Sequence, residues 1–407
     1  MDTDTRSASA LPGVTAVLGS GRRPESPADI RARFERASAK VEQASRRAWA
    51  DRRFNRELWD AIVAEGILGL IDAGDQAGTV ANFGAALEGI AAGSGDPGFT
   101  IVPITHGLLG MGVIAQAAAP EVGEQWLRRL STGREILAFA LSEEHGGTDA
   151  LRPRTTITRD GEDYRLDGVK WHITSAPVAD VALVWAKDVE NGDLVGVLVE
   201  TASPGVSVTS LEPAGTRSAP VGRYAFEGVH IPHRNVLGRG RGKELLNAAL
   251  RRERIMAGFV GTGAMDRMLQ HAVRFAATRE AGGKVIAYHQ HIQRRLCDIK
   301  LRLDTIRMLT ADAVAKMAAG QRYTLEASQV KMSSMRACMD AVTDTIQVCG
   351  SYGVQEEAGL YQMWLDAVCV SIAGGTEEAH RLVIMQELVR DFALRAAAES
   401  GPADAAA

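Results

Sequence analysis

The stretch Ile157-Thr-Arg-Asp-Gly-Glu-Asp-Tyr-Arg-Leu166 decides the fold class, because it predicts a β-hairpin in the middle of a largely helical chain. Ile157 to Arg159 and Tyr164 to Leu166 lie on the two sides of Asp160-Gly161. Asp-Gly between two such runs is a strong hairpin turn signal. Further β-rich runs lie at 181–186, 194–199 and 224–229. We therefore predict a central β domain at 136–242.

Helical periodicity fills the chain on both sides of this β domain. Ser26 and Pro27 suit the N-cap and the first position of a helix. They follow a stretch rich in Ser, Gly, Pro and Arg at 1–25, which we expect to be a flexible arm. Apolar residues then recur every three or four positions, which is typical of amphipathic helices. The first such run contains Ile30, Phe34, Ala37, Val41 and Ala44. The same period returns after the β domain, where Gly350 is predicted to end a helix.

Three blocks define the predicted architecture. They are an N-terminal all-α domain at 26–135, the central β domain, and a C-terminal helical domain at 243–398, before a frayed tail at 399–407. Segregated helical and β blocks are typical of α+β proteins, whereas a doubly wound parallel sheet needs alternating strands and helices. A chain of 407 residues is long enough for two or three domains. The predicted fold class is therefore α+β in three blocks.

Composition excludes several classes of protein. The net charge is −4, so we expect no chain-wide basic surface and no nucleic-acid partner. The most apolar stretch, 101–119, is interrupted by Pro103 and His106, which favours a buried core helix over a membrane span. The first 25 residues lack the apolar segment of a signal peptide, so a cytoplasmic location is expected. Without C-x-x-C spacing, the cysteines are expected to be buried free thiols, and no metal site is predicted. They are Cys297, Cys338, Cys349 and Cys369.

Four widely separated motifs combine glycines with hydroxyl, amide and basic side chains. They are Phe139-Ala-Leu-Ser-Glu-Glu-His-Gly-Gly-Thr-Asp149, Gly168-Val-Lys-Trp-His-Ile-Thr-Ser175, Thr278-Arg-Glu-Ala-Gly-Gly-Lys-Val-Ile286 followed by His289-Gln290, and Ile372-Ala-Gly-Gly-Thr-Glu-Glu378. Glycines allow a ligand to approach the backbone closely. Together these motifs resemble the acyl-CoA dehydrogenase family of flavoproteins over roughly residues 28–395.

The resemblance implies a fold and an activity. The implied fold is an N-terminal helical domain, a β-barrel-like domain and a C-terminal four-helix bundle, assembled as a homotetramer or dimer. FAD is then held between the β domain and the bundles of two subunits. The implied reaction is α,β-dehydrogenation of an acyl thioester of coenzyme A or of a carrier protein. Electrons pass from the flavin to electron-transfer flavoprotein or to another acceptor.

The resemblance also implies which residues contact FAD. In the β domain they are Phe139, Leu141, Ser142, Gly147, Thr148, His172, Ile173 and Thr174. In the C-terminal domain they are Arg279, Gln290, Gln347, Gly350, Thr376 and Glu378. Arg279 suits the pyrophosphate of a neighbouring subunit, because a guanidinium is a fixed cation with forked donors. The plain alternatives are a turn or strand position for Ser142 and Thr148, a surface ion pair for Arg279 and a helix end for Gln347.

The catalytic base is implied by a second comparison with the family. Many members place a glutamate directly before the Gly-Thr of the last motif, where this chain has Gly374. Members similar to isovaleryl-CoA dehydrogenase carry it in a Glu-Arg pair on the first helix after the β domain, which here is Glu253-Arg254. Glu253 is therefore expected to remove the α-proton, and burial would raise its pKa toward that task. Arg254 is expected to orient Glu253 or to contact the polar arm of the acyl carrier. An N–H of Gly374 or Gly375 would polarise the thioester carbonyl.

Departures from the family pattern keep other functions open. His172 stands where the family has Trp or Phe, Glu144-His145 replaces Pro-Gly, and Leu365 replaces the Arg before Asp366. One alternative is a flavin monooxygenase for N- or C-hydroxylation on the same fold, which needs no glutamate base. Another is a non-catalytic binding protein, which the flavin-contact motifs argue against. Glu253 itself has the alternative of an ordinary solvated helix residue.

Overall fold

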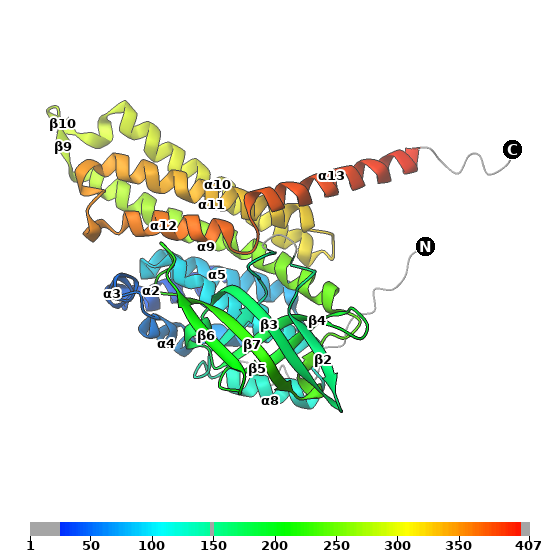
Figure 1. Cartoon of the computed structure of the whole chain (residues 1–407). Coiled ribbons are helices and arrows are strands. Elements are labelled where there is room, and N and C mark those ends of the chain that lie inside the picture. The colour runs from blue at the N-terminus through cyan, green and yellow to red at the C-terminus, as the bar shows by residue number, and fades with distance from the viewer. Residues whose placement is uncertain (1–24, 147–149, 400–407) are drawn as a thin grey trace.

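The computed structural model describes residues 25–146 and 150–399. It consists of N-terminal helices, a central β-sheet and a set of long C-terminal helices, which confirms the predicted α–β–α order (Figure 1). The sheet lies against the N-terminal helices, and the C-terminal helices lie across the top of both. Gly147 and Thr148, most of the predicted arm and most of the predicted tail lie outside the described residues.

The N-terminal domain begins as its sequence predicts and then departs from it. Ser26 caps α2 through a capping box with Asp29. The helices are α2 (Pro27–Ala39), α3 (Glu42–Ala50), α4 (Arg56–Ala64), α5 (Gln76–Ser94) and α8 (Pro120–Leu130). The prediction that one helical run continues through Val41 is wrong, because Val41 leaves helical geometry with φ −112° and ψ 14°. The break reorients α3 so that Glu42 pairs with Arg267 of the C-terminal domain.

The apolar segment at 97–117 is a continuous, buried helical run. It contains a 3₁₀ turn (Pro97–Thr100), α6 (Ile101–Pro103), a π-helical stretch (Ile104–Met111) and α7 (Gly112–Ala117). By length and composition alone it could cross a membrane, but 94% of its apolar window is buried inside the fold, as in core helices of water-soluble domains. Within it, the Nδ1 of His106 accepts a hydrogen bond of 3.0 Å from the backbone N–H of Leu137. This bond ties the helical run to the first strand of the sheet.

The β domain has the strand order β6-β7-β3-β2-β4-β5-β8, with β1 paired to β4. The strands are β1 (Leu137–Ala140), β2 (Thr156–Asp160), β3 (Asp163–Thr174), β4 (Val181–Asp188), β5 (Leu194–Glu200), β6 (Val206–Leu211), β7 (Val221–Ile231) and β8 (Val236–Leu237). The predicted hairpin is β2–β3, with Ile157 opposite Leu166 and Gly161 in its turn at φ +67°. A bulge between Lys170 and Ile173 changes the pairing of β3 with β7.

The C-terminal domain is built from α9 (Gly242–Thr278), α10 (Gln290–Ala318), α11 (Thr324–Cys349), α12 (Leu360–Ile372) and α13 (Glu377–Glu399). A short hairpin, β9 (Glu280–Ala281) and β10 (Lys284–Val285), joins α9 to α10. Gly350 follows the last residue of α11 with φ +59°, as predicted. The expectation of buried thiols is wrong for Cys297, which is exposed on α10, and Cys369 is only partly buried, whereas Cys338 and Cys349 are buried.

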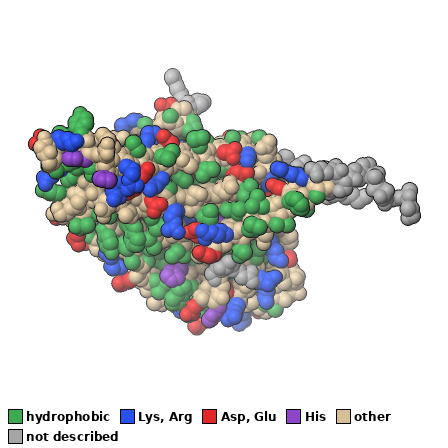
Figure 2. Space-filling model, turned by 90° about the horizontal axis from the view of Figure 1, so that it is seen from above, with side chains coloured by type: hydrophobic (Ala, Val, Ile, Leu, Met, Phe, Trp, Pro, Cys, Tyr) green, Lys and Arg blue, Asp and Glu red, His purple; other side chains and the backbone are tan. Residues whose placement is uncertain are grey.

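The outer half of α13 projects away from the body of the molecule (Figure 1). The exposed large apolar side chains along the whole of α13 are Leu382, Met385, Leu388, Val389, Phe392 and Leu394. Seen from above, the face formed by the C-terminal helices carries hydrophobic side chains among charged ones (Figure 2). Exposed apolar area of this kind is typical of a contact surface.

Candidate active site

Glu253 and Gly374 lie against each other although they come from different ends of the C-terminal domain. Glu253 is on α9, and Gly374 is in the loop between α12 and α13. A Cβ atom added to Gly374 would lie 2.3 Å from Oε2 and 2.5 Å from Oε1 of Glu253. Gly374 also has φ +71°, a conformation that L side chains rarely adopt. The absence of a side chain at 374 therefore leaves the space that the Glu253 carboxyl group fills.

The environment of Glu253 suits a base. Its Oε2 is buried and has no hydrogen-bond partner. Burial raises the pKa of Glu253, and the charges of Lys331 and Arg254 oppose that rise. A desolvated carboxylate with a free oxygen binds a proton more tightly than a hydrated one. The group can therefore accept a proton from a carbon acid that lies in its pocket.

Two further residues, neither of which belongs to a sequence motif, complete this cluster. Lys331 of α11 is buried, and its Nζ donates a hydrogen bond of 2.8 Å to the carbonyl oxygen of Val370. His380 of α13 is 1% exposed, and neither ring nitrogen has a hydrogen-bond partner. Burial and the charges of Arg254 and Lys331 lower the pKa of His380 to about 4, so its imidazole is neutral at pH 7. A lone Lys or His on an amphipathic helix forms no motif, so no sequence signal could have identified them.

A hollow of about 240 Å³ lies beside this cluster, between α11, the loop after α12 and the start of α13. Thr376 and Glu378, two of the implied FAD contacts, line it together with Lys331 and His380. The hydroxyl of Thr376 accepts a hydrogen bond of 3.3 Å from the N–H of Ala379 in the first turn of α13. The structure thus brings these two residues to the same loop as Gly374.

A buried ion pair fixes the backbone of the first motif. Lys170 of β3 is fully buried, and its Nζ donates hydrogen bonds of 2.9 Å to the Leu141 carbonyl and to Oε1 of Glu143. The Trp171 N–H donates a bond of 2.8 Å to the Ser142 carbonyl. Burial favours a higher pKa for Glu143, but Lys170 and hydrogen bonds from Thr155 outweigh it and hold the pKa at about 2. Leu141 and Ser142 therefore have a fixed backbone geometry next to β3.

The residues of the second motif lie at and beside the bulge of β3. His172 is exposed and has φ +56°, which is rare for a residue with a side chain. Its ring lies edge-on to that of Trp171, with 5.8 Å between the ring centroids. Ile173 is buried and Thr174 is half-buried. Phe139, from the first motif, is buried, with its ring 6.1 Å from that of Trp185.

The remaining implied FAD contacts gather at the far end of the C-terminal helices. They are the exposed residues Arg279, Gln290, Gln347 and Gly350. The guanidinium of Arg279 lies 5.6 Å from the ring centroid of Tyr352, and no carboxylate among the described residues pairs with it. Glu253 lies within α9 and Arg279 directly follows its last residue, 26 positions later, which is about 39 Å at 1.5 Å per residue. This group and Glu253 therefore cannot serve one small ligand within a single chain.

Comparison with known proteins gives a match along almost the whole chain. Three family models match it: "Acyl-CoA dehydrogenase, N-terminal domain" at 27–134, "middle domain" at 138–229 and "C-terminal domain" at 240–389. Cyclohexane-1-carbonyl-CoA dehydrogenase of Geobacter metallireducens is 33% identical over 67% of this chain and 73% of its own length. L-prolyl-[peptidyl-carrier protein] dehydrogenase of Pseudomonas fluorescens is 28% identical over 83% of this chain and 91% of its own.

Solved structures show the same likeness. Butyryl-CoA dehydrogenase from Megasphaera elsdenii superposes with a TM-score of 0.81 at 25% identity, covering 96% of this chain and all of that chain. The prolyl acyl carrier protein oxidase AnaB gives a TM-score of 0.84 at 25% identity, covering 90% of this chain and all of its own.

Proposed function

Because the chain belongs to the acyl-CoA dehydrogenase family, we propose that Glu253 is the base of its reaction and that Gly374 makes room for it. The protein is an FAD-dependent oxidoreductase that dehydrogenates acyl thioesters. One observation supports the assignment of the base. Oε2 of Glu253 is buried without a hydrogen-bond partner, and the carboxyl group occupies the space that a side chain at 374 would take. This is the placement that resembles isovaleryl-CoA dehydrogenase.

Each residue of the site has a separate role in the proposed reaction. Glu253 removes the α-proton of the thioester, and the raised pKa favours its transfer to the carboxylate. The backbone N–H of Gly374 or Gly375 donates to the thioester carbonyl oxygen and so stabilises the negative charge that develops there. The positive charges of Arg254 and Lys331 oppose the rise in the pKa of Glu253 and so favour the ionised carboxylate, which is the form that accepts a proton. Bound FAD would supply the acceptor for the hydride of the β-carbon.

The polar groups available in this chain suit FAD, but they occupy two separate places. Leu141 and Ser142 present a rigid backbone beside β3. Arg279 has a guanidinium without a carboxylate partner among the described residues, which suits a pyrophosphate. Because Arg279 is far from Glu253, we assign it to the FAD of a second subunit, in a homodimer or homotetramer. Gln290, Gln347 and Gly350 are assigned to that same contact.

The substrate carrier and the electron acceptor belong to the same proposal. The relatives include enzymes named for coenzyme A thioesters and one named for a carrier-protein thioester, so both carriers are candidates here. Electron-transfer flavoprotein is the proposed acceptor, and the cytoplasmic location stays a prediction. The monooxygenase alternative is not favoured, because the named relatives reported above are dehydrogenases or an oxidase.

The experiment that tests this function is an anaerobic visible spectrum of the purified holoenzyme, recorded before and after adding acyl thioesters. The set contains straight, branched and cyclic acyl-CoAs and the same acyl groups on a carrier protein. We expect at least one of them to bleach the oxidised flavin band without a reductase. Flavin that stays oxidised with every thioester, but consumes oxygen once chemically reduced, would contradict the dehydrogenase and favour the monooxygenase.

A further inference from the structure

The glycine loop, residues 373–376, is firmly held at the end where α12 enters it. Lys331 of α11 donates a hydrogen bond of 2.8 Å from its Nζ to the carbonyl oxygen of Val370, near the end of α12. One turn earlier, Oδ1 of Asp366 accepts a hydrogen bond of 2.9 Å from Nε1 of Trp49 in the N-terminal domain. These contacts fix α12 up to the last residues before the loop.

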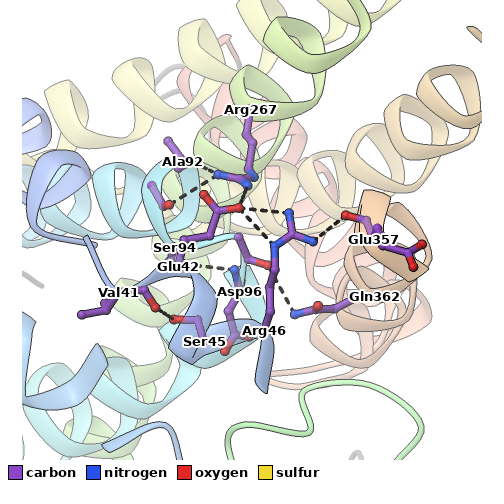
Figure 3. Close-up of polar contacts among 12 residues, drawn as sticks. Val41, Glu42, Ser45, Arg46, Ala92, Ser94, Asp96, Arg267, Glu357 and Gln362 are labelled. Carbon is purple, nitrogen blue, oxygen red and sulfur yellow. Dashed lines mark hydrogen bonds and ion pairs between the residues drawn. The ribbon is translucent and has the colours of Figure 1, made fainter. Parts of the chain in front are cut away.

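The start of α12 is fastened to the N-terminal domain as well. The Nε2 of Gln362 donates a hydrogen bond of 3.3 Å to the Gly95 carbonyl. Just before α12, the Glu357 carbonyl accepts a hydrogen bond of 3.0 Å from Arg46 of α3. Figure 3 shows these contacts and the ion pair of Arg46 with Glu42. Contacts at both ends of α12 therefore hold the α12 side of the glycine loop in place.

The other side of the loop continues into α13, which has few buried side chains. Among the residues of α13 whose burial the structure describes, only His380 and Glu387 are buried. They are seven residues apart, which places them on one face of the helix. Glu387 accepts a hydrogen bond of 2.6 Å from Nε of Arg322, in the segment before α11. His380 is thus the buried side chain of α13 that lies nearest to the loop in sequence.

The ring of His380 lies where a side chain on Gly375 would point. A Cβ atom added to Gly375 would lie 3.2 Å from Nε2 and 3.3 Å from Cε1 of the ring. Gly375 has φ +113°, a backbone conformation that L side chains rarely adopt. The Glu253 carboxyl group takes the corresponding space beside Gly374. Each glycine of the loop is therefore packed against the side chain of another residue.

Hydrogen bonding does not explain why a histidine occupies position 380. The side chain is 1% exposed, and neither ring nitrogen has a partner among the described residues. Burial of an unpaired polar ring destabilises the fold, whereas an apolar side chain of similar size would avoid that cost. The charges of Arg254 and Lys331 also act on the ring, and both disfavour its protonation. What histidine supplies at this position is a flat, neutral ring packed against the glycine backbone.

We propose that His380 is a positioning residue, whose ring restrains the backbone of Gly375 and so fixes the glycine loop beside Glu253. Glycine has the greatest backbone freedom of all residues, so two adjacent glycines depend on neighbouring groups for a single conformation. Restraint by His380 on the α13 side complements the contacts of α12 on the other side. The consequence for the reaction rests on the proposed function, in which an N–H of Gly374 or Gly375 donates to the thioester carbonyl. The restraint of the loop itself does not.

The restraint is tested by amide hydrogen exchange of the FAD-bound protein without substrate, followed by mass spectrometry of peptides that contain residues 373–376. We expect the loop amides to exchange at least about tenfold faster in H380A than in wild type, because the loop then opens locally more often. E387Q is the matched control, since it weakens the contact of the other buried side chain of α13 and leaves His380 in place. Its loop amides should exchange as in wild type.

Two outcomes of the exchange experiment would overturn the proposal. Equal loop exchange in wild type and H380A would mean that the ring does not restrain the loop. Equally fast exchange in H380A and E387Q would mean that any loosening of α13 has the same effect, so that His380 has no specific role. If H380A fails to fold, H380N, which keeps a planar polar group but shortens the side chain, decides the same comparisons.

The effect on the reaction is tested by stopped-flow reduction of the bound flavin with a saturating thioester. We expect the rate constant to fall roughly 100-fold in H380A, since a displacement of about 1 Å has that cost, while the dissociation constant of the thioester changes little. Free imidazole should restore part of the rate, because the space of the missing ring adjoins the hollow of about 240 Å³. A loss of rate that imidazole does not relieve, or a wild-type rate in H380A, would overturn the link to the reaction. A wild type whose flavin no thioester reduces would refute the proposed function instead, and the hydrogen-exchange result would still stand.

Discussion

Replacing Gly374 with alanine tests the packing of the active site, and its effect can be worked out from the structure. The new Cβ would lie 2.3 Å from Oε2 of Glu253, whereas ordinary contacts begin at 3.4 Å. The carboxyl group must therefore retreat by about 1.1 Å, and a misplacement of about 1 Å can cost roughly 100-fold in rate. That factor corresponds to about 2.7 kcal/mol of activation free energy.

The assay is stopped-flow reduction of the enzyme-bound flavin by a saturating thioester under anaerobic conditions. Alanine at φ +71° also costs about 1–2 kcal/mol of folding free energy, so stability must be measured in parallel. Gly240→Ala is the matched control, because Gly240 has φ +70° and nothing within 4 Å of its Cβ position. We expect both variants to lose stability and only Gly374→Ala to lose rate. A Gly374→Ala enzyme that reduces flavin at the wild-type rate would refute the packing argument.

Three other predictions follow from the ion pairs and exposed cations. Lys170→Met leaves Glu143 without its buried partner, so the free energy of unfolding in urea should fall by about 3 kcal/mol or more. A loss below about 1 kcal/mol would contradict a stabilising role of the Lys170–Glu143 ion pair. Because the pKa of Glu143 is lowered to about 2 from an ordinary 4.5, its contribution to folding stability is complete above pH 4.5 and is lost as pH falls toward 2. Acid unfolding of wild type should show this loss of stability, and acid unfolding of Glu143→Gln should not. Arg279→Ala should weaken FAD binding about tenfold, measured by flavin release on dilution, whereas Arg274→Ala, at an exposed position nearby, should not. Equal FAD affinities of wild type and Arg279→Ala would contradict the role of Arg279.

Local patterns in the sequence predict most of the fold. The Asp-Gly hairpin, the Ser26 cap and the Gly350 helix end are all encoded within a few residues, and the structure contains each of them. The break at Val41 was not predictable from periodicity, because it serves a contact with Arg267 more than 200 residues away. Long-range ion pairs leave no periodic signal.

The candidate site also combines residues that sequence motifs identify with residues that only long-range packing brings together. Gly374 and Glu253 were identified because the family resemblance supplies both positions, and the structure shows that the two residues touch. Lys331 and His380 belong to no motif, and only the packing of α11 and α13 around the glycine loop brings them to Glu253. The packing of Phe139 against Trp185 was also not predictable, since the two residues are 46 positions apart in the sequence.

The measurement that tests the central claim most directly is the exchange of the substrate α-proton with solvent deuterium. A saturated acyl thioester is incubated anaerobically in D₂O with wild-type holoenzyme or with Glu253→Gln, and the recovered thioester is analysed by mass spectrometry. If Glu253 is the base, wild type should incorporate deuterium at the α-carbon, and Glu253→Gln should retain FAD but incorporate at least about 1,000-fold less. Exchange at the wild-type rate in Glu253→Gln would contradict the account, because another group would then remove the proton.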